Sequence, residues 1–263
     1  MKGSKDLITD NTLIFETLSP GGNGEKYIFQ NPKYIYDAFS IDDVEEAITN
    51  LQAKINEGFY CAGYISYEAG FAFENSLKKL YKGKIWDKPI LWFGVFENKE
   101  KFTESRESHS YSTGNFIFNH EKEEYRDKIE RIKTYIKNGI TYQINYTGKI
   151  KFEFEGESFG MYSDLKKRQS AGYTAFIRNI YGDILSFSPE LFFKKDDIKI
   201  ISKPMKGTAK RGKNISEDLK ITNILRESEK DCAENVMIVD LIRNDMGKIS
   251  EFGSVKVKKL VKR

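Results

Sequence analysis

The chain has 263 residues, with 43 Lys and Arg against 39 Asp and Glu, which gives a net charge of +4 at pH 7. Hydrophobic residues make up 39% and aromatic residues 14%, enough for a core, so a disordered, collagen-like or coiled-coil chain is excluded. The lysines alternate with acidic residues, so the charge pattern does not support nucleic-acid binding. The longest apolar run is too short to span a membrane, and the N-terminus lacks the apolar core of a signal peptide. We therefore expect a cytoplasmic protein without a membrane segment.

The first part of the sequence predicts short strands around one helix. Aromatic-rich segments are typical of strands, and one amphipathic segment is typical of a helix: residues 26–29, 59–67 and 90–96 for strands, and 42–56 for the helix. The polar stretch over residues 97–115 predicts a long hairpin connection or an inserted loop. No linker rich in Pro, Gly or Ser follows it, so we expect one domain over 1–263, with a looser half over 1–115 and a motif-bearing half over 116–263.

The second part predicts two long helices separated by closely spaced strands. The first helix, over 121–138, has its apolar residues on one face and is followed by Gly139. The second is expected over 216–246, with Ser216 as its N-cap, and its apolar VMIVDLI segment should be buried. Strands are predicted over 149–155, 173–179, 184–188, 191–195, 198–201 and 254–261. Such spacing leaves no room for parallel crossovers, which favours an α+β fold with antiparallel sheets and outer helices.

The segment YQINYTG carries Gln143 and Asn145, two uncharged hydrogen-bonding side chains among aromatic residues. A capped loop between the 121–138 helix and the next strand is the simpler interpretation of these residues. The alternative is a segment that contacts a polar substrate.

Two further segments, SPELF and KPMKGTAKRG, bring a carboxylic acid and an amine into unusual surroundings. Glu190 has Phe187, Leu191 and Phe192 as neighbours, and burial among them would raise its pKa and suit a general acid. Lys206 precedes Gly207 among other cations, and desolvation there would lower its pKa toward that of a nucleophilic amine. The alternative is a lysine-rich surface turn.

The acidic residues of RESEKDCAENVMIVDLIRND suggest a cation site. On a continuous helix Glu227, Asp231 and Glu234 would form one stripe, and like charges at this spacing are unfavourable. A Mg²⁺ ion, which binds few protein carboxylates, would relieve the repulsion. Pairing with Lys230 on the surface is an equally good explanation.

Taken together, four segments in this order and spacing resemble the family of chorismate-utilising enzymes: YQINYT, SPELFF, KPMKGTAKRG and ESEKDCAENVMIVDLIRND. The resemblance runs from about residue 121 to the end of the sequence and is looser before it. It implies the α+β fold of that family, in which antiparallel sheets are sandwiched with outer helices.

Two positions distinguish branches of the family. The isochorismate and salicylate synthases carry a lysine that activates water where this chain has Gln143, and anthranilate synthases typically carry Ala where it has Lys206. The resemblance therefore implies the branch of aminodeoxychorismate synthase component I. That branch converts chorismate and ammonia to 4-amino-4-deoxychorismate for the synthesis of 4-aminobenzoate and folate. The alternatives are anthranilate synthase component I and a non-catalytic remnant.

The resemblance also implies a role for each candidate residue. Lys206 would be the nucleophile and Glu190 the general acid, while Gln143 and Thr208 would contact the substrate. Glu234 would bind Mg²⁺ directly, with Asp231 as a weaker candidate. Ammonia would come from a glutamine amidotransferase subunit, because the sequence shows no Cys–His arrangement for that reaction.

Members of this family continue beyond the strand after the DLIRND helix, with further magnesium carboxylates, an arginine and a Gly-rich loop. The sequence ends at Arg263, so we expect a truncated or degenerate member that has little activity alone. Such a chain should also expose a sheet edge or part of a core.

Overall fold

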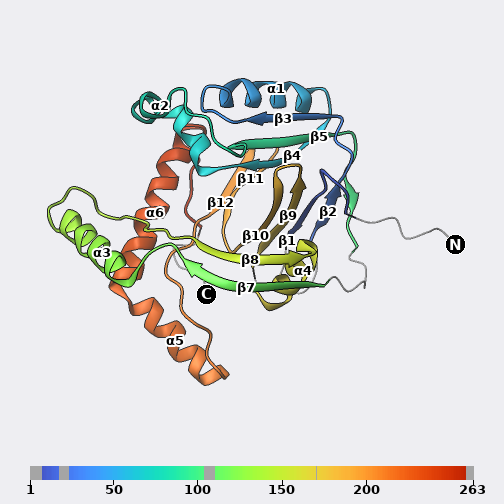
Figure 1. The fold of residues 1–263 in the computed structure, drawn as a ribbon. Coiled ribbons are helices and arrows are strands. Elements are labelled where there is room, and N and C mark those ends of the chain that lie inside the picture. The colour runs from blue at the N-terminus through green and yellow to red at the C-terminus, as the bar shows by residue number, and fades with distance from the viewer. Residues whose placement is uncertain (1–7, 18–23, 104–109, 170, 259–263) are drawn as a thin grey trace. The chain divides into compact units, whose positions relative to one another are not determined.

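The computed structural model describes residues 8–17, 24–103, 110–169 and 171–258 (Figure 1). The chain forms two compact units, which are described separately below. The first unit combines the chain up to Thr103 with the chain from Gln169 onward, and the second is the segment 104–168 between them.

A five-stranded antiparallel sheet joins the beginning of the first unit to its later part. Its strands lie in the order β10-β9-β1-β2-β6, with these bounds: β1 Leu13–Thr17, β2 Lys26–Phe29, β6 Glu100–Lys101, β9 Tyr173–Asn179 and β10 Gly182–Ser188. Leu13 of β1 lies opposite both Phe29 and Ile177. The pairing of β1 with β9 therefore joins the two stretches of sequence that make up this unit.

A second sheet of the first unit carries its helical layer. Its strands lie in the order β3-β5-β4, and α1 packs on it, with these bounds: β3 Tyr34–Ala38, β4 Tyr60–Ile65, β5 Leu91–Phe96 and α1 Val44–Asn56, followed by η1 Tyr67–Phe73 and α2 Asn75–Tyr81. The helix buries Val44, Ala47 and Leu51 at steps of three and four, which is the spacing of one helix face. Leu13, Trp92 and Phe96 belong to a second cluster of buried side chains that includes Ile177 from β9.

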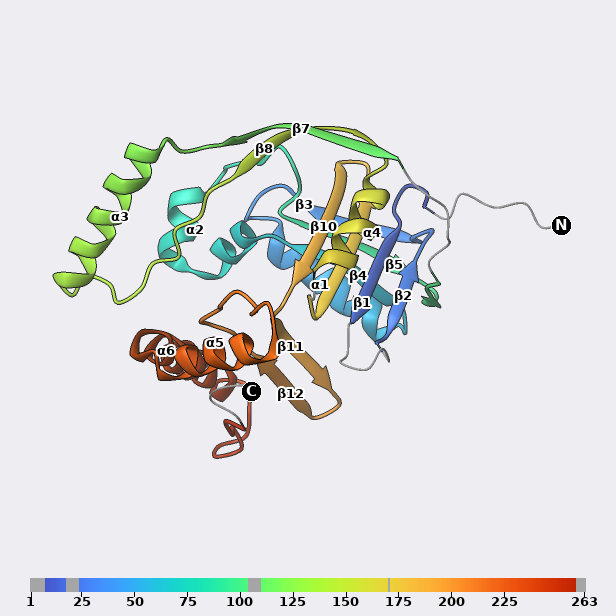
Figure 2. The ribbon, with the colours of Figure 1, turned by 90° about the horizontal axis from the view of Figure 1, so that it is seen from below.

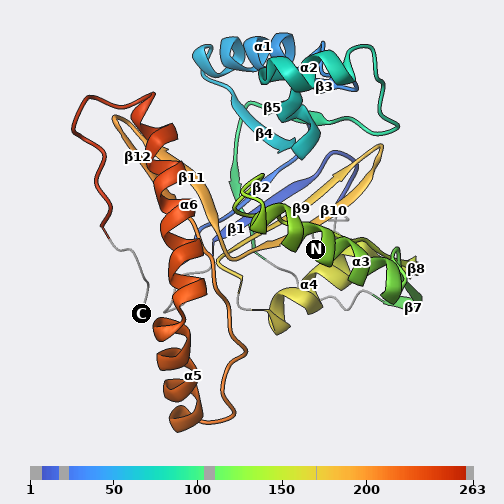
Figure 3. The same cartoon turned by 90° about the vertical axis from the view of Figure 1, so that its left-hand side faces the viewer.

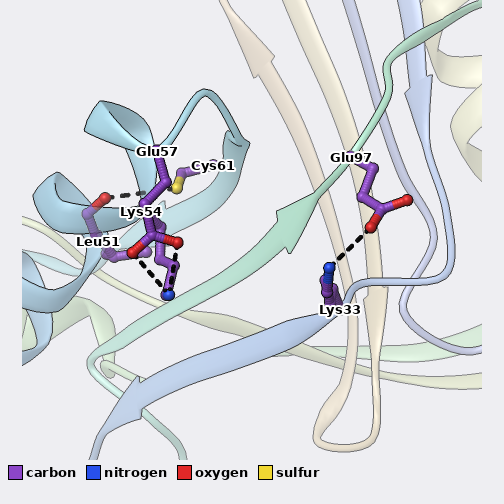
Figure 4. A network of polar contacts seen from close by, with 6 residues as sticks. All are labelled: Lys33, Leu51, Lys54, Glu57, Cys61 and Glu97. Carbon is purple, nitrogen blue, oxygen red and sulfur yellow. Dashed lines mark hydrogen bonds and ion pairs between the residues drawn. The ribbon is translucent and has the colours of Figure 1, made fainter.

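Three polar contacts lie beside the β3-β5-β4 sheet and α1 (Figure 4). The Lys33 ammonium lies 2.9 Å from Glu97, and Lys54 lies 2.8 Å from Glu57 at the end of α1. The Cys61 thiol donates to the Leu51 carbonyl at 3.7 Å, and burial raises the pKa of this thiol. Cys61 thus serves as a packed, weakly reactive thiol of the core.

The motif-bearing segments of the first unit lie on a hairpin and two helices: β11 Leu191–Asp196, β12 Lys199–Lys203, α5 Ile215–Glu227 and α6 Glu229–Gly247. Figure 2 shows β11 and β12 as a hairpin of their own, apart from the five-stranded sheet. Every residue of α5 and α6 is at least partly exposed.

The single helix predicted over 216–246 is two helices (Figure 3). Ser228 has an extended backbone (ψ 107°), and its hydroxyl accepts from the Asp231 amide at 3.3 Å, so it ends one helix and caps the next. The first cap is also shifted, because Asn214 and not Ser216 accepts from the Glu217 amide, at 2.9 Å. The prediction missed these caps because helical periodicity continues across them.

Two other expectations for this region are wrong. The VMIVDLI segment is not buried, since Val236 is 45% and Leu241 47% exposed. Its other apolar residues, Met237, Ile238, Val239 and Ile242, are half-buried, so the described residues cover the segment only in part. Residues 254–258 form no strand, although 254–261 was predicted as one, and 259–261 lie outside the described residues.

The second unit contains a two-stranded ribbon and two helices: β7 Tyr111–Phe118, α3 Lys122–Lys137, β8 Ile150–Gly156 and α4 Ser158–Arg168. Figure 2 shows β7 and β8 running side by side as a long ribbon, and their pairing is antiparallel. The predicted helix over 121–138 and strand over 149–155 are confirmed. Every residue of β8 is exposed, and every residue of α3 is at least partly exposed.

The α+β class with antiparallel sheets is confirmed by these elements. Among the described residues, no helix is both long and apolar enough to cross a membrane.

Candidate active site

Glu190 occupies the turn between β10 and β11. The Ser188 hydroxyl donates to the Glu190 carbonyl at 3.0 Å, and the Glu190 amide lies 3.2 Å from the same hydroxyl. The burial expected for this carboxyl group is wrong, because Glu190 is exposed. Phe192, one of the apolar neighbours that were expected to cover it, is itself 81% exposed. The local sequence therefore supplies a polar turn and not an apolar pocket.

A backbone hydrogen bond connects Glu190 to the loop that carries Lys206. The Met205 amide donates to Glu190 Oε1 at 3.2 Å across a separation of 15 residues. The carboxylate and the amine-bearing loop are thus neighbours in the fold. Lys206 is half-buried and Thr208 is exposed.

The same loop contacts α6 through Gly207. This residue has φ +68°, a left-handed conformation that glycine adopts at no steric cost. A Cβ atom added to it would lie 3.0 Å from Asp231 Cβ, 3.1 Å from Oδ1 and 3.3 Å from Cγ. The Asp231 side chain therefore covers the face of Gly207 where another residue would have its own side chain.

A third connection fastens the end of the loop to α5. Arg211 donates to Asp218 Oδ1 at 2.8 Å, and the Gly212 amide donates to the same atom at 2.9 Å. The Gly212 amide, followed by the Arg211 guanidinium, lowers the pKa of Asp218. A Cβ atom on Gly212 would lie 2.3 Å from the Asp218 nitrogen, so this approach of two backbones requires glycine.

The acidic stripe expected on one helix is interrupted. Glu227 ends α5, whereas Asp231 and Glu234 lie on α6 beyond the break at Ser228. Lys230 Nζ lies 3.8 Å from Glu234 Oε1, as expected from the surface-pairing alternative. Glu234 keeps only 26% of its side chain exposed.

Two carboxylates on α6 remain as candidate magnesium ligands. Among the described residues no group of three or more His, Cys, Asp or Glu side chains is arranged to hold a metal ion. Mg²⁺ commonly binds one or two protein carboxylates and takes its other oxygen ligands from water and substrate. The donor chemistry of Glu234 and Asp231 fits that kind of site.

Gln143 belongs to the second unit, where it lies half-buried in the connection between α3 and β8. The Thr141 hydroxyl donates to the Gln143 backbone carbonyl at 3.0 Å. Tyr146 of the same segment has its ring 5.4 Å from His120 and 5.6 Å from Tyr125, centroid to centroid. Aromatic contacts thus hold the YQINYT segment within its own unit. Within the first unit the structure brings Glu190, the Lys206 loop and Asp231 together, whereas Gln143 belongs to the second unit.

The five-stranded sheet carries a cavity of about 230 Å³. Its lining includes Glu16, Thr174 and Ser188 from β1, β9 and β10. Glu16 is 2% exposed, and its carboxylate lies 2.9 Å from the Lys26 ammonium. The cavity wall therefore includes a buried, ion-paired carboxylate. Ser188 connects the cavity to the Glu190 turn.

Three of these connecting residues were missed in the sequence: Ser188, Asp218 and Gly212. Ser188 lies two residues before Glu190, a spacing typical of hydroxyl–backbone turns. Asn214 followed three residues later by Glu217 is a helix-start signal that competed with Ser216. The contact of Gly207 with Asp231 has no local signal, because the two residues lie far apart in the chain.

The family model described as "chorismate binding enzyme" matches residues 13–263. Aminodeoxychorismate synthase component 1 of Escherichia coli (strain K12) is 38% identical over 148 residues, which cover 56% of this chain and 33% of the relative. The protein of the same name from Bacillus subtilis (strain 168) is 33% identical over 153 residues, covering 58% and 33%. The chain thus matches about a third of the length of these curated relatives.

The chain is also similar to an anthranilate synthase subunit in sequence and to an isochorismate synthase in structure. Anthranilate synthase alpha subunit 1, chloroplastic, of Arabidopsis thaliana is 37% identical over 139 residues, covering 53% of this chain and 23% of the relative. A crystal structure described as a 2,3-dihydroxybenzoate-specific isochorismate synthase from Bacillus anthracis superposes with a TM-score of 0.68. The superposition covers 92% of this chain and 62% of the Bacillus anthracis chain. Because the sequence identity is 15%, this similarity supports the fold alone.

Proposed function

The chain belongs to the chorismate binding enzyme family, and on that premise we propose that it acts as an aminodeoxychorismate synthase component I. In this role it converts chorismate and ammonia to 4-amino-4-deoxychorismate, a step toward 4-aminobenzoate and folate. The relatives from Escherichia coli and Bacillus subtilis that carry this name support the proposal.

The observation that carries the proposal is the placement of Lys206. Its loop is bonded to Glu190 through the Met205 amide and contacts Asp231 through Gly207. An amine, a carboxylic acid and a candidate cation ligand are therefore connected by consecutive residues of one loop. This combination suits a reaction in which a nucleophile adds to an anionic substrate while a hydroxyl group leaves.

In the proposed reaction the neutral Lys206 amine adds to C2 of chorismate. Both ring double bonds shift toward C4, the bond between C4 and its hydroxyl breaks, and Glu190 supplies the proton with which that hydroxyl leaves as water. Ammonia then adds to C4 while the C2–N bond breaks, which releases the lysine amine. The water and ammonia account for all atoms lost and gained.

The remaining residues bind and orient the reactants. Glu234 is the proposed magnesium ligand, with Asp231 as the weaker candidate, and bound Mg²⁺ supplies positive charge for a substrate carboxylate. Thr208 and Gln143 are proposed to hydrogen-bond the substrate. A glutamine amidotransferase subunit is the proposed source of ammonia, and the cytoplasm is the proposed location.

Anthranilate synthase component I is the second candidate, because the Arabidopsis thaliana relative with that name is similarly close, at 37% identity. The two candidates differ in whether a lysine amine takes part in the reaction. Lys206 favours the first candidate, since the resemblance implies Ala at this position in anthranilate synthases.

Product analysis distinguishes the candidates. Two protein samples are each incubated with chorismate, Mg²⁺ and an ammonium salt. One is the 263-residue chain, and the other is the product of the complete reading frame that encodes it. Products are identified by liquid chromatography and mass spectrometry. Lys206→Ala is the test variant and Lys210→Ala, a change in an exposed lysine of the same loop, is the matched control.

From the product of the complete reading frame we expect 4-amino-4-deoxychorismate in the wild type and in the Lys210→Ala variant, with a loss of about a hundredfold or more in Lys206→Ala. Anthranilate as the main product would transfer the assignment to the second candidate. Folded protein that binds chorismate but forms neither product would indicate a non-catalytic chorismate-binding chain.

A further inference from the structure

Asp231 contacts the Lys206 loop through its side chain. The space that a Cβ atom of Gly207 would occupy is bounded by three Asp231 atoms at 3.0–3.3 Å. A real Cβ atom would be crowded at these distances, so only a glycine lets the loop backbone pass this close to Asp231. The contact lies one residue from Lys206 and one residue from Thr208.

The start of α6 holds Asp231 in place. Its amide donates to the Ser228 hydroxyl at 3.3 Å, which makes Asp231 the capped residue of the first helical turn. Glu234 lies almost one turn further along and faces Lys230 at 3.8 Å. The two carboxylates on α6 therefore have different surroundings, one against the loop backbone and one beside a cation.

The loop is also fixed on the other side of Lys206. The Met205 amide donates to Glu190 at 3.2 Å, so the residues immediately before and after Lys206 are both held by side chains from other elements. A short segment held at both ends has little freedom to change its backbone. The direction in which the Lys206 side chain leaves the loop therefore depends on both contacts.

We infer that Asp231 is a positioning residue, which holds Lys206 in place by packing beside Gly207. This inference rests on the proposed function for its catalytic meaning, but the packing contact itself does not depend on any substrate. It assigns a steric role to the Asp231 side chain, so the shape of the side chain should matter more than its charge.

Competitive acetylation of lysines with acetic anhydride, followed by peptide mass spectrometry, tests this role without substrate or metal. Lys203 and Lys210 in the same loop region serve as internal references. Asp231→Ala removes the two outer atoms of the contact, Asp231→Asn keeps its shape, and Asp240→Ala changes an exposed carboxylate on the same helix.

We expect acetylation of Lys206, relative to the references, to rise about threefold or more in Asp231→Ala, because the loop loses one of its two contacts. Asp231→Asn and Asp240→Ala should match the wild type. Unchanged acetylation in a folded Asp231→Ala variant would overturn the inference. So would an Asp231→Asn variant that behaves like Asp231→Ala, since charge and not shape would then be decisive.

Gly207→Ala tests the contact from the other side and is used if Asp231→Ala does not fold. The added methyl group would collide with Asp231, so acetylation of Lys206 should rise as well. Wild-type acetylation in this variant would overturn the inference. The proposed function can fail separately: a rise in acetylation without any aminodeoxychorismate product would retain the positioning role and remove its catalytic meaning.

Discussion

Two regions of the first unit are built on different interactions. Around β1, β5 and β9, apolar side chains such as Leu13, Trp92 and Phe96 are buried almost completely. On α5 and α6, which carry the acidic motif, every residue is at least partly exposed, and Leu241 is 47% exposed. The first region is held by hydrophobic packing, and the second by caps, ion pairs and close glycine contacts.

This difference indicates how the candidate site is organised. The loop with Lys206 is positioned by the Glu190, Asp218 and Asp231 side chains, each through a polar or steric contact of its own. Segments with few buried apolar contacts open at low free energy. We therefore expect the core region to set the global stability and the motif region to respond to local changes.

The largest effect is expected from a core truncation. Phe96→Ala should lower the free energy of unfolding by about 3–5 kcal/mol, because Phe96 is 1% exposed and packs in the buried cluster. Leu241→Ala on α6 should cost less than about 1 kcal/mol. Urea denaturation of the two variants and the wild type gives both values.

If Leu241→Ala lowered the free energy of unfolding about as much as Phe96→Ala, the two regions would not differ in their packing. It would mean that α6 packs against a surface in solution, such as a second copy of the chain. A concentration-dependent unfolding midpoint would identify that case.

A smaller effect is expected at the break between α5 and α6. Ser228→Ala removes the hydroxyl that accepts from the Asp231 amide and should cost α6 about 1 kcal/mol of local stability. Hydrogen exchange of the α6 amides measures this cost, and Ser228→Asn, which restores a capping oxygen, is the control. If exchange slows in Ser228→Ala, the two helices have merged into the single helix that the sequence pattern predicted.

The contact between the loop and α5 should depend on pH. The Gly212 amide and the Arg211 guanidinium lower the pKa of Asp218 from 3.8, so the folded state prefers its charged form. The resulting stabilisation is complete above the unfolded value and is lost as pH falls through the lower folded value. Wild type and Asp218→Asn should therefore differ in α5 hydrogen exchange at pH 6 and converge only once the pH falls below the lowered pKa of Asp218. A difference that grows as pH falls would contradict the assignment.

The smallest expected effect concerns the rates at which the two cysteines are alkylated, Cys61 and Cys232. Burial raises the pKa of Cys61, so less of its thiol is ionised at a given pH and alkylation is slowed. Iodoacetamide should label Cys61 in the folded chain about tenfold more slowly than in urea at pH 8. The ratio should shrink as pH rises toward the Cys61 pKa. Cys232, on α6, is the internal comparison, and equal protection of both thiols would contradict the contrast.

Local patterns in the sequence predicted many of the elements. Alternating and aromatic-rich segments gave β2, β5, β8 and β9, and amphipathic periodicity gave α1 and α3. β1 and β3 were missed, because the pairing of β1 with β9 and of β3 with β5 joins segments far apart in the sequence, which local patterns do not show. The break at Ser228 was missed since a serine is compatible with a continuing helix, and only its backbone geometry shows the cap.

Burial was the least predictable property. The surroundings of Glu190 looked apolar in the sequence, but its neighbours on the strand include Phe192, which faces solvent. Whether an apolar residue is covered depends on which distant segment packs on it, and sequence spacing does not encode that. The contact of Gly207 with Asp231 is non-local in the same way, and it is the contact on which the positioning of Lys206 depends.

The most direct test of the central claim is the mass of the protein after incubation with chorismate and Mg²⁺ in the absence of ammonia. We predict an adduct with the mass of chorismate less one water, located on Lys206 by peptide mapping. The adduct should form in Lys210→Ala and be absent from Lys206→Ala. A folded chain that binds chorismate without forming this adduct, or that forms it equally in Lys206→Ala, would contradict the claim that Lys206 is the nucleophile.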